Sequence, residues 1–253
     1  MFKHIIVRRP CRQMIQGLTA ASLGQPDYDQ ALKQHDAYIE AMKQCGVEVT
    51  VLEADERYPD STFIEDTAVL TQQCAIVTNP GAPSRKGEEV KVAETLTAFY
   101  QDIETIDAPG TLDGGDVMMV GDHFYIGLSQ RTNREGAAQF IAALEKYGYT
   151  GSVVPLEKVL HLKTGVAYLE NNNLLAAGEF LDNKEFKQYN IIPVPDDESY
   201  AANSIWVNGT VLVPAGYPRL SASVQQAGYP IIEVDVSEFR KLDGGLSCLS
   251  LRF

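Results

Sequence analysis

The chain alternates short apolar runs with longer stretches of helical periodicity, and the same order returns along its length. In residues 66–78 (DTAVLTQQCAIVT), two β-rich segments flank the polar pair Gln72-Gln73. Apolar runs of this length joined by a tight polar turn predict a β-hairpin. Similar runs occupy residues 116–128, 165–177 and 203–213, and Asn208-Gly209 in the last is the strongest turn signal of the chain.

Helical patterns and further short strands accompany these hairpins. Helices are predicted over residues 28–45, 87–100, 133–147, 182–189 and from Pro218 onward. The strands that follow them are predicted over residues 47–52, 103–107, 152–156, 191–195 and 231–236. For the helix at 133–147, the pair Thr132 and Glu135 reads as a capping box. The repeated unit is therefore strand, strand, helix, strand.

A fifth unit is split between the two ends of the chain. The stretch LDGG at 242–245 repeats LDGG at 112–115, and the alternation around Cys248 in GGLSCLSLRF predicts a strand there. The N-terminal run KHIIVRR supplies a second strand that pairs with it. Pairing of the two ends closes a ring and leaves no orphan strand. We therefore predict one α/β domain over residues 1–253, a five-bladed pseudo-symmetric propeller of ββαβ repeats.

Composition limits the classes of partner that the chain can bind and indicates its cellular compartment. The chain has 253 residues, 45% of them hydrophobic, and a formal charge of −13, which argues against nucleic acid and anionic membranes as partners. No stretch approaches the roughly 20 apolar residues of a membrane helix, and the N-terminus lacks a signal-peptide core. Cysteines are few, without CxxC or framework spacing, which predicts a cytoplasmic protein with free thiols.

Ring closure would bring together a set of chemically active residues. The repeat starts carry Glu65-Asp66, Asp113 with Asp116, His161, Asn203 and Cys248. A histidine can accept the proton of a thiol or stabilise its thiolate, and a carboxylate can orient the imidazole ring. Cys248, His161 and Asp113 are therefore a candidate nucleophilic group. The surplus acids would raise the pKa of the thiol unless a cation lay between them, and a bound guanidinium is such a cation.

Two arginines of the chain complete the predicted ligand-binding site. Arg85 and Arg131 each follow a hairpin and precede a helix, so they would lie at one rim and clamp a carboxylate. The predicted ligand resembles arginine. Each residue also has a structural reading: Cys248 as a buried apolar residue, His161 as a core histidine and the acids as turn caps. Cys11, Cys45 and Cys74 are predicted to be buried, while His4, His35 and His123 are interpreted as strand, helix-surface and turn residues.

No cofactor site is predicted. His161 and Cys248 lack a close second pair of ligands, which disfavours zinc. The glycines of LDGGDV lack the G-x-G-x-x-G spacing of a dinucleotide loop and indicate close backbone approach instead.

At these residues the whole chain resembles the guanidine-modifying superfamily, whose fold is a five-bladed α/β propeller, and within it the compact bacterial dimethylarginine dimethylaminohydrolases. The matching stretches are FIEDTAVL, NPGAPSRKGE, LDGGDVMMVGDHFYIGLSQRTN, LEKVLHLKTGVAYL, NNNLLAAGEF, ESYAANSIWVN, VPAGYPR and KLDGGLSCLSLRF. The resemblance implies hydrolysis of methylated arginines to citrulline through a covalent thiouronium on Cys248, without metal or organic cofactor. It also implies a small-molecule substrate and a homodimer formed at propeller edges.

The same resemblance implies a role for each matching position. Cys248 is the nucleophile, His161 the general acid and base, and Asp113 stands where the family carries Asp or Glu to orient that histidine. The implied substrate contacts are Asp66 and Glu65 for the guanidinium, Arg85 and Arg131 for the carboxylate, and Asp60 with the carbonyls of Leu18 and Leu242 for the amino-acid end. Leu18 lies on a loop, IQGLTAASLGQ, that resembles the family's mobile lid.

Alternatives come from inside and outside this superfamily. Arginine deiminases share the nucleophile, histidine and acids but generally carry an added helical domain, for which this chain has no room. Agmatine lacks a carboxylate, so Arg85 and Arg131 argue against an agmatine deiminase. Arginine deiminase-like or another guanidine hydrolysis is the second hypothesis. A propeller that only binds a partner, like the ribosome anti-association factors, is disfavoured by Cys248, His161 and the negative charge.

Overall fold

The structure, a computed structural model, describes residues 1–253 and divides into two compact units. Unit 1 contains residues 1–64 and 165–253, and unit 2 contains residues 65–164. Three three-stranded sheets lie in unit 1 and two in unit 2. In every sheet the central strand is antiparallel to one neighbour and parallel to the other. The predicted α/β class and its repeated sheet are confirmed.

Unit 2 is built from two consecutive repeats. Its elements, with the short turns at its two junctions included, are η2 Ile64–Thr67, β3 Ala68–Leu70, β4 Ala75–Val77, η3 Pro83–Arg85, α2 Glu88–Leu96, β5 Ile103–Thr105, η4 Gly114–Asp116, β6 Val117–Val120, β7 His123–Leu128, α3 Arg134–Glu145, β8 Thr150–Pro155 and α4 Leu162–Gly165. The strand orders are β3-β4-β5 and β6-β7-β8. The buried faces of β4, β6, β7 and α3 share one apolar cluster, which includes Phe124 and Phe140.

Unit 1 contains the other three sheets. Its elements are β1 His4–Arg8, η1 Arg12–Gln16, α1 Tyr28–Gln44, β2 Glu48–Leu52, β9 Val166–Tyr168, β10 Asn173–Ala176, η5 Gly178–Phe180, η6 Lys184–Phe186, β11 Asn190–Pro193, η7 Asp196–Ala202, β12 Ile205–Val207, β13 Thr210–Pro214, α5 Pro218–Gln226, β14 Ile231–Val234, α6 Ser237–Arg240, η8 Ser247–Leu249 and β15 Leu251–Arg252. The strand orders are β15-β1-β2, β11-β10-β9 and β12-β13-β14.

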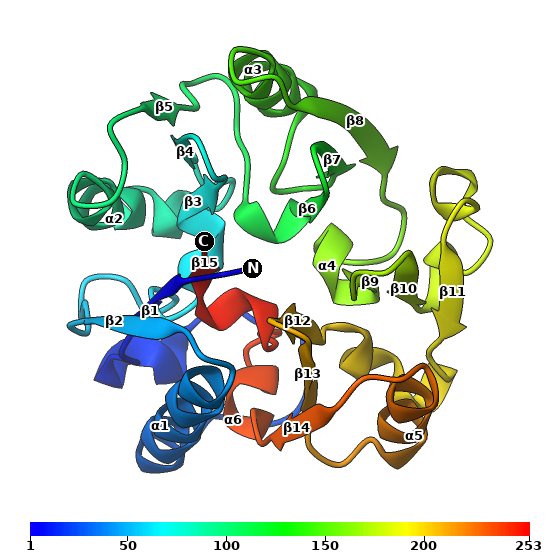
Figure 1. The fold of residues 1–253 in the computed structure, drawn as a ribbon. Helices are drawn as coiled ribbons and strands as arrows, with labels where there is room; N and C mark the ends of the chain where they lie inside the picture. The colour runs from blue at the N-terminus through cyan, green and yellow to red at the C-terminus, as the bar shows by residue number, and fades with distance from the viewer. The chain divides into compact units, whose positions relative to one another are not determined.

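The two ends of the chain pair as the sequence predicted. β15, red in Figure 1, is antiparallel to β1, in blue, with Ile5 opposite Arg252 and Ile6 opposite Leu251. The backbone N–H groups of Lys3 and His4 also donate to the carbonyl of the last residue, at 2.8 and 2.9 Å. Because Ile5 and Ile6 are fully buried, this pairing is anchored by apolar packing as well as by hydrogen bonds.

Local chemistry explains the best-predicted elements. Asn208 and Gly209 join β12 to β13 with φ values of 50° and 94°, the pair of positive angles that a two-residue hairpin turn requires. At the start of α1 the Asp27 side chain accepts from the N–H of Gln30, and Pro218 occupies the first turn of α5. None of the helices is long and apolar enough to cross a membrane.

The predicted strand around Cys248 is wrong. Residues Ser247–Leu249 form the 3₁₀ turn η8, and β15 covers only Leu251–Arg252. The alternation that suggested a strand is absent, because Leu246, Ser247 and Leu249 are all buried. Side chains elsewhere in unit 1 hold the turn: Tyr38 donates its hydroxyl hydrogen to the carbonyl of Leu246 at 3.0 Å. A contact so distant in sequence is not visible in a local pattern.

Four other local predictions are also corrected. The cap of α3 is Asn133, whose side chain accepts from the N–H of Gly136, and Thr132 instead accepts from the N–H of Asp113 at 3.1 Å. Residues 182–189 contain only the 3₁₀ turn η6, and His123 begins β7 rather than lying in the turn before it. His35 is fully buried on α1, not on the helix surface.

Candidate active site

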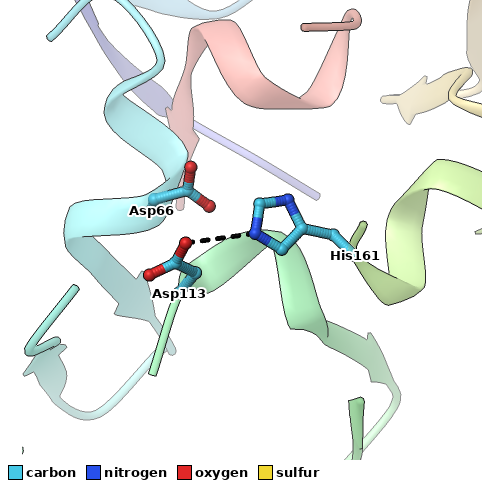
Figure 2. A group of neighbouring side chains, drawn as sticks. All are labelled: Asp66, Asp113 and His161. Carbon is cyan, nitrogen blue, oxygen red and sulfur yellow. Dashed lines mark hydrogen bonds and ion pairs between the residues drawn. The ribbon is translucent and has the colours of Figure 1, made fainter. Parts of the chain in front are cut away.

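Unit 2 gathers an imidazole between buried carboxylates. His161 precedes α4, and its Nε2 lies 3.1 Å from Oδ2 of Asp113, the residue just before η4 (Figure 2). The second oxygen of Asp113 accepts from the N–H of Gly81 at 2.8 Å, and Asp113 is fully buried. The aspartate is therefore long enough to reach the imidazole at a position where the family resemblance allows Asp or Glu. The contact fixes one ring nitrogen and leaves Nδ1 for other chemistry.

Asp66 lies beside this pair and is bonded on two sides. Its Oδ1 accepts from the N–H of Gly115 at 2.8 Å, and its Oδ2 pairs with Arg85 at 2.5 Å. Arg85 is itself buried and forms a second ion pair with Glu88 at 2.7 Å. Burial raises the pKa of Asp66, but the charges of His161 and Arg85 outweigh it and leave that pKa below its usual value. Asp66 is therefore an ionised carboxylate beside the imidazole.

The carboxylates decide the charge of His161. Burial on its own would lower the pKa of the imidazole, but the negative charge of Asp66, the hydrogen bond to Asp113 and the charge of Asp116 raise it to about 9. At neutral pH His161 is therefore an imidazolium ion. Such a group can donate a proton to a leaving amine and can stabilise a nearby thiolate.

The two glycines of LDGGDV make this packing possible. A Cβ on Gly114 would lie 2.0 Å from the carbonyl oxygen of Glu65, and one on Gly115 would lie 2.8 Å from Nδ1 of His161. Real Cβ atoms do not approach so closely, so any larger residue would push these backbones or the ring away. The sequence interpretation of the glycines as close backbone approach is confirmed.

The remaining predicted residues of unit 2 surround this group. Glu65 is buried and accepts from Nζ of Lys163 at 2.6 Å. Nη1 of Arg131 lies 3.8 Å from Oδ2 of Asp113. Unit 2 therefore brings Glu65, Asp66, Asp113 and His161 together with their cationic partners. That Arg85 and Arg131 bind a substrate carboxylate stays a prediction.

The residues that could bind a metal ion in unit 2 already form bonds with other groups of the protein. Asp66, Asp113 and His161 each offer one ligand atom, and these atoms lie within 4.8 Å of one another. Yet Asp66 is paired with Arg85, and Asp113 bonds His161 and Gly81. Each of the three donor residues is therefore already bonded to partners within the protein.

In unit 1, Cys248 stands on the turn η8 and is partly exposed. Asn203 holds this turn from two sides: its Oδ1 accepts from the N–H of Ser247 at 2.9 Å, and its Nδ2 donates to the Ser247 hydroxyl at 3.0 Å. The N–H of Gly245 points at Sγ of Cys248, 3.4 Å away. The thiol is therefore carried by a turn with fixed geometry, in contrast to the three other cysteines, which are buried as predicted.

The predicted contacts for the amino-acid end form a second group in unit 1. The side chain of Asp60 is buried and accepts from the N–H of Leu18 at 2.9 Å. Gly17, the residue before Leu18, approaches both Asp60 and Leu242. A Cβ on Gly17 would lie 2.8 Å from Oδ1 of Asp60 and 3.3 Å from the Leu242 side chain. Leu18, Asp60 and Leu242 thus lie together.

Sequence reasoning missed Asp243, Glu88 and Lys163. Asp243 accepts from the N–H of Ala20 at 2.6 Å and so ties the predicted lid loop to the segment of Leu242. Glu88 and Lys163 are the ionic partners of Arg85 and Glu65. The available signal was position: Lys163 is two residues after His161, and Glu88 is three after Arg85 on the first turn of α2.

Known proteins resemble the chain over its whole length. The family described as N,N dimethylarginine dimethylhydrolase, eukaryotic, matches residues 22–203. The N(G),N(G)-dimethylarginine dimethylaminohydrolase of Pseudomonas aeruginosa is 61% identical over 100% of both chains. The chain belongs to the dimethylarginine dimethylaminohydrolase family. The resemblance predicted from its motifs is thereby confirmed, and with it the class of the enzyme, a hydrolase.

Solved structures of this family match the fold closely. A cysteine-to-serine variant of the Pseudomonas aeruginosa enzyme, complexed with citrulline, has a TM-score of 0.99, 61% identity and 100% coverage of both chains. A histidine-to-glycine variant of a dimethylarginine dimethylaminohydrolase, as an adduct with S-methyl-L-thiocitrulline, gives the same values. The predicted homodimer and cytoplasmic location stay predictions.

Proposed function

We propose that this member of the family hydrolyses Nω-methylated arginines, asymmetric dimethylarginine and monomethylarginine, to citrulline and dimethylamine or methylamine. The observation that carries the proposal is the His161–Asp113 contact of 3.1 Å, in which carboxylates raise the pKa of the imidazole to about 9. A protonated histidine in this setting suits the departure of an amine. The full-length similarity to a named dimethylarginine dimethylaminohydrolase supports the same reaction.

We also infer one catalytic domain over residues 1–253, folded as a five-bladed propeller closed by its terminal strands. The repeated sheet order in each unit and the pairing of β15 with β1 support this inference. The TM-score of 0.99 over the whole chain to the citrulline complex supports it as well.

In the first half-reaction, the thiolate of Cys248 attacks the central carbon of the substrate guanidinium and forms a C–S bond. The tetrahedral intermediate then collapses, the bond from carbon to the dimethylated nitrogen breaks, and His161 gives its proton to that nitrogen. Dimethylamine leaves, and an S-linked thiouronium remains on Cys248. Asp66 offsets the positive charge of the reacting group in this step.

In the second half-reaction, neutral His161 removes a proton from a water molecule that attacks the thiouronium carbon. Collapse of the new intermediate breaks the C–S bond and expels the Cys248 thiolate, and the second proton of the water, now on the ureido oxygen of the product, passes to solvent as neutral citrulline is released. His161 is again protonated and ready for the next cycle. Acid–base catalysis of this kind contributes on the order of 10²–10⁴-fold to the rate. The cycle requires no metal or organic cofactor.

The proposed substrate contacts divide by chemistry. Glu65 and Asp66 bind the guanidinium, because paired carboxylates accept the parallel N–H groups of that cation. Arg85 and Arg131 bind the substrate carboxylate. Asp60 and the carbonyls of Leu18 and Leu242 hold the α-ammonium group, and their proximity in unit 1 supports that role.

Two measurements test this function. The first compares kcat/KM for arginine, its monomethyl and asymmetric dimethyl forms, and agmatine. We expect the methylated arginines to be preferred, while a clear preference for unmethylated arginine would make the chain a deiminase. The second compares Cys248→Ser with the matched control Cys45→Ser. The first variant should release no citrulline from asymmetric dimethylarginine with its fold intact, and the control should remain active. A fully active Cys248→Ser would reject the mechanism.

A further inference from the structure

Asp116 is a buried acid that the proposed chemistry does not use. It ends the 3₁₀ turn η4 and has no exposed surface. Each of its two oxygens serves a different segment of unit 2. Oδ1 accepts from the backbone N–H of Leu162 at 3.0 Å, and Oδ2 accepts from the hydroxyl of Ser129 at 2.6 Å.

The contact with Leu162 holds the segment that carries the imidazole. Leu162 directly follows His161 and begins α4, where the first backbone N–H groups have no partner within the helix. The N–H of His161 itself is 3.4 Å from the hydroxyl of Thr164. Asp116 therefore fixes the backbone next to the ring.

The contact with Ser129 connects Asp116 to Asp113, the residue that bonds the imidazole of His161. The Ser129 hydroxyl oxygen accepts from the N–H groups of Arg131 and Thr132, at 2.9 and 3.1 Å. The hydroxyl of Thr132 in turn accepts from the N–H of Asp113 at 3.1 Å. A continuous path of hydrogen bonds therefore connects Asp116 to the backbone of Asp113.

We propose that Asp116 is a positioning residue, which does not touch the substrate. Through its hydrogen bonds it holds the backbone segments of His161 and Asp113 so that their side chains stay in contact. The inference rests on the proposed function, since it assigns Asp116 to the same reaction. Asp116 is the acid of η4. Its bonds reach the segment of His161 through Leu162 and the backbone of Asp113 through Ser129 and Thr132.

The donors around Asp116 explain why an acid occupies this position. Leu162 offers an N–H, and Ser129 already accepts two N–H groups, so its own hydrogen points to Asp116. Both partners donate, and only a carboxylate accepts at both oxygens. An asparagine would place an NH₂ group against one of these donors. Leaving a buried donor unpaired is costly, so the side chain is matched to both contacts.

Charge adds a second effect. Burial raises the pKa of Asp116 to about 6, while His161 and the hydrogen bonds from Ser129, Thr132 and Leu162 oppose that rise. The charged groups around the imidazole are Asp66, Asp113 and Asp116, and the first two carry Arg85 and Arg131 as partners. Removal of the charge of Asp116 should therefore lower the pKa of His161.

The experiment replaces Asp116→Asn and compares it with Asp122→Asn, an exposed acid in the turn that follows β6. For Asp116→Asn we expect kcat on asymmetric dimethylarginine to fall roughly 10–100-fold with KM nearly unchanged, as for partners that support a catalytic group. The control should keep the kcat of the unmodified chain. A folded Asp116→Asn variant with unchanged kcat would overturn the proposal.

A second measurement needs no substrate. The chain has only 4 histidines, so the imidazole of His161 can be assigned and titrated by NMR. Its pKa should fall in Asp116→Asn, and an unchanged titration would contradict the proposal. If the unmodified chain released no citrulline, the proposed function would fail, while this titration would still decide whether Asp116 acts on His161.

If Asp116→Asn does not fold, Ser129→Ala decides. This variant keeps the bonds of Asp116 to Leu162 and Thr132 and removes the bond from Ser129 that begins the path toward Asp113. A fall in kcat of about 10-fold at constant KM, in a folded protein, would support the positioning role. A folded Ser129→Ala variant with the kcat of the unmodified chain would overturn it.

Discussion

Two buried histidines, one in each unit, lie in opposite electrostatic surroundings. His35 on α1 of unit 1 has no exposed surface, and neither of its ring nitrogens has a hydrogen-bond partner. His161 of unit 2 is 8% exposed and lies between carboxylates. Burial lowers the pKa of His35 to about 4, with a further lowering by Arg9 that Asp36 and the Arg8 backbone oppose only partly. The pKa of His161 instead rises to about 9.

The difference teaches that burial alone does not set the charge of a histidine. Both rings are removed from water, which disfavours the imidazolium form. His35 packs near Phe239, and the charge of Asp36 and the Arg8 backbone offset that cost only partly, so the ring stays neutral. Around His161 three aspartates more than compensate it. Only His161 is therefore equipped to deliver a proton at neutral pH.

The largest expected effect of replacing one of these two histidines is the loss of catalysis in a His161 variant. His161→Gln removes the proposed proton donor and leaves Asp66, Asp113 and Asp116 without the imidazolium that they share. We expect kcat for citrulline release to fall by roughly 10³-fold or more. Steady-state kinetics on asymmetric dimethylarginine measures the loss.

His35→Leu is the matched control, because it also removes a buried imidazole but lies outside the proposed machinery. Its kcat should equal that of the unmodified chain at neutral pH. Equal losses in the two variants would mean that the difference between the two histidines has no bearing on the reaction.

A smaller effect concerns stability at acid pH. The folded pKa of His35 lies below its unfolded value near 6.5, so the unfolded chain binds the proton first. Stability therefore falls as pH decreases from about 6.5 to about 4. Between pH 7 and pH 5 this one group should cost about 2 kcal/mol of unfolding free energy, a loss that His35→Leu should avoid. Urea unfolding of both proteins at the two pH values measures it.

His161 should behave in the opposite way. Because its folded pKa is raised, its stabilising contribution is complete below pH 6.5 and is lost as pH rises through about 9. The unfolding free energies of the unmodified chain and of His161→Gln should converge as pH rises through that window. A constant difference between them would show that the carboxylates do not hold a charged imidazole.

Local chemistry made much of the fold predictable from the sequence. Asn208-Gly209 specifies its hairpin by itself, because few other pairs adopt two positive φ angles. The stripe of α1 and the proline of α5 likewise depend on nearby residues. His35 lies on that stripe, four residues after buried Ala31 and three before buried Tyr38, so its burial was also readable. Interpreting it as a surface residue gave its polarity too much weight.

The rest depends on contacts that are distant in sequence. The turn at Cys248 is set by Asn203 and Tyr38, more than forty residues away along the chain. Thr132 caps no helix because Asp113 takes its hydroxyl oxygen. Motifs did predict that Asp113 and His161 lie together, since both carry side chains with recognisable chemistry. The ionic partners Lys163 and Glu88 were not identified, because charged residues next to a motif are usually solvated.

The central claim is that Cys248 forms a covalent bond with the substrate carbon while His161 manages the protons. The most direct test is to quench the reaction with asymmetric dimethylarginine in acid and map the protein by peptide mass spectrometry. We predict a thiouronium adduct, the mass of the substrate less dimethylamine, on the peptide that contains Cys248. Citrulline release without such an adduct, or with the adduct on another cysteine, would contradict the account.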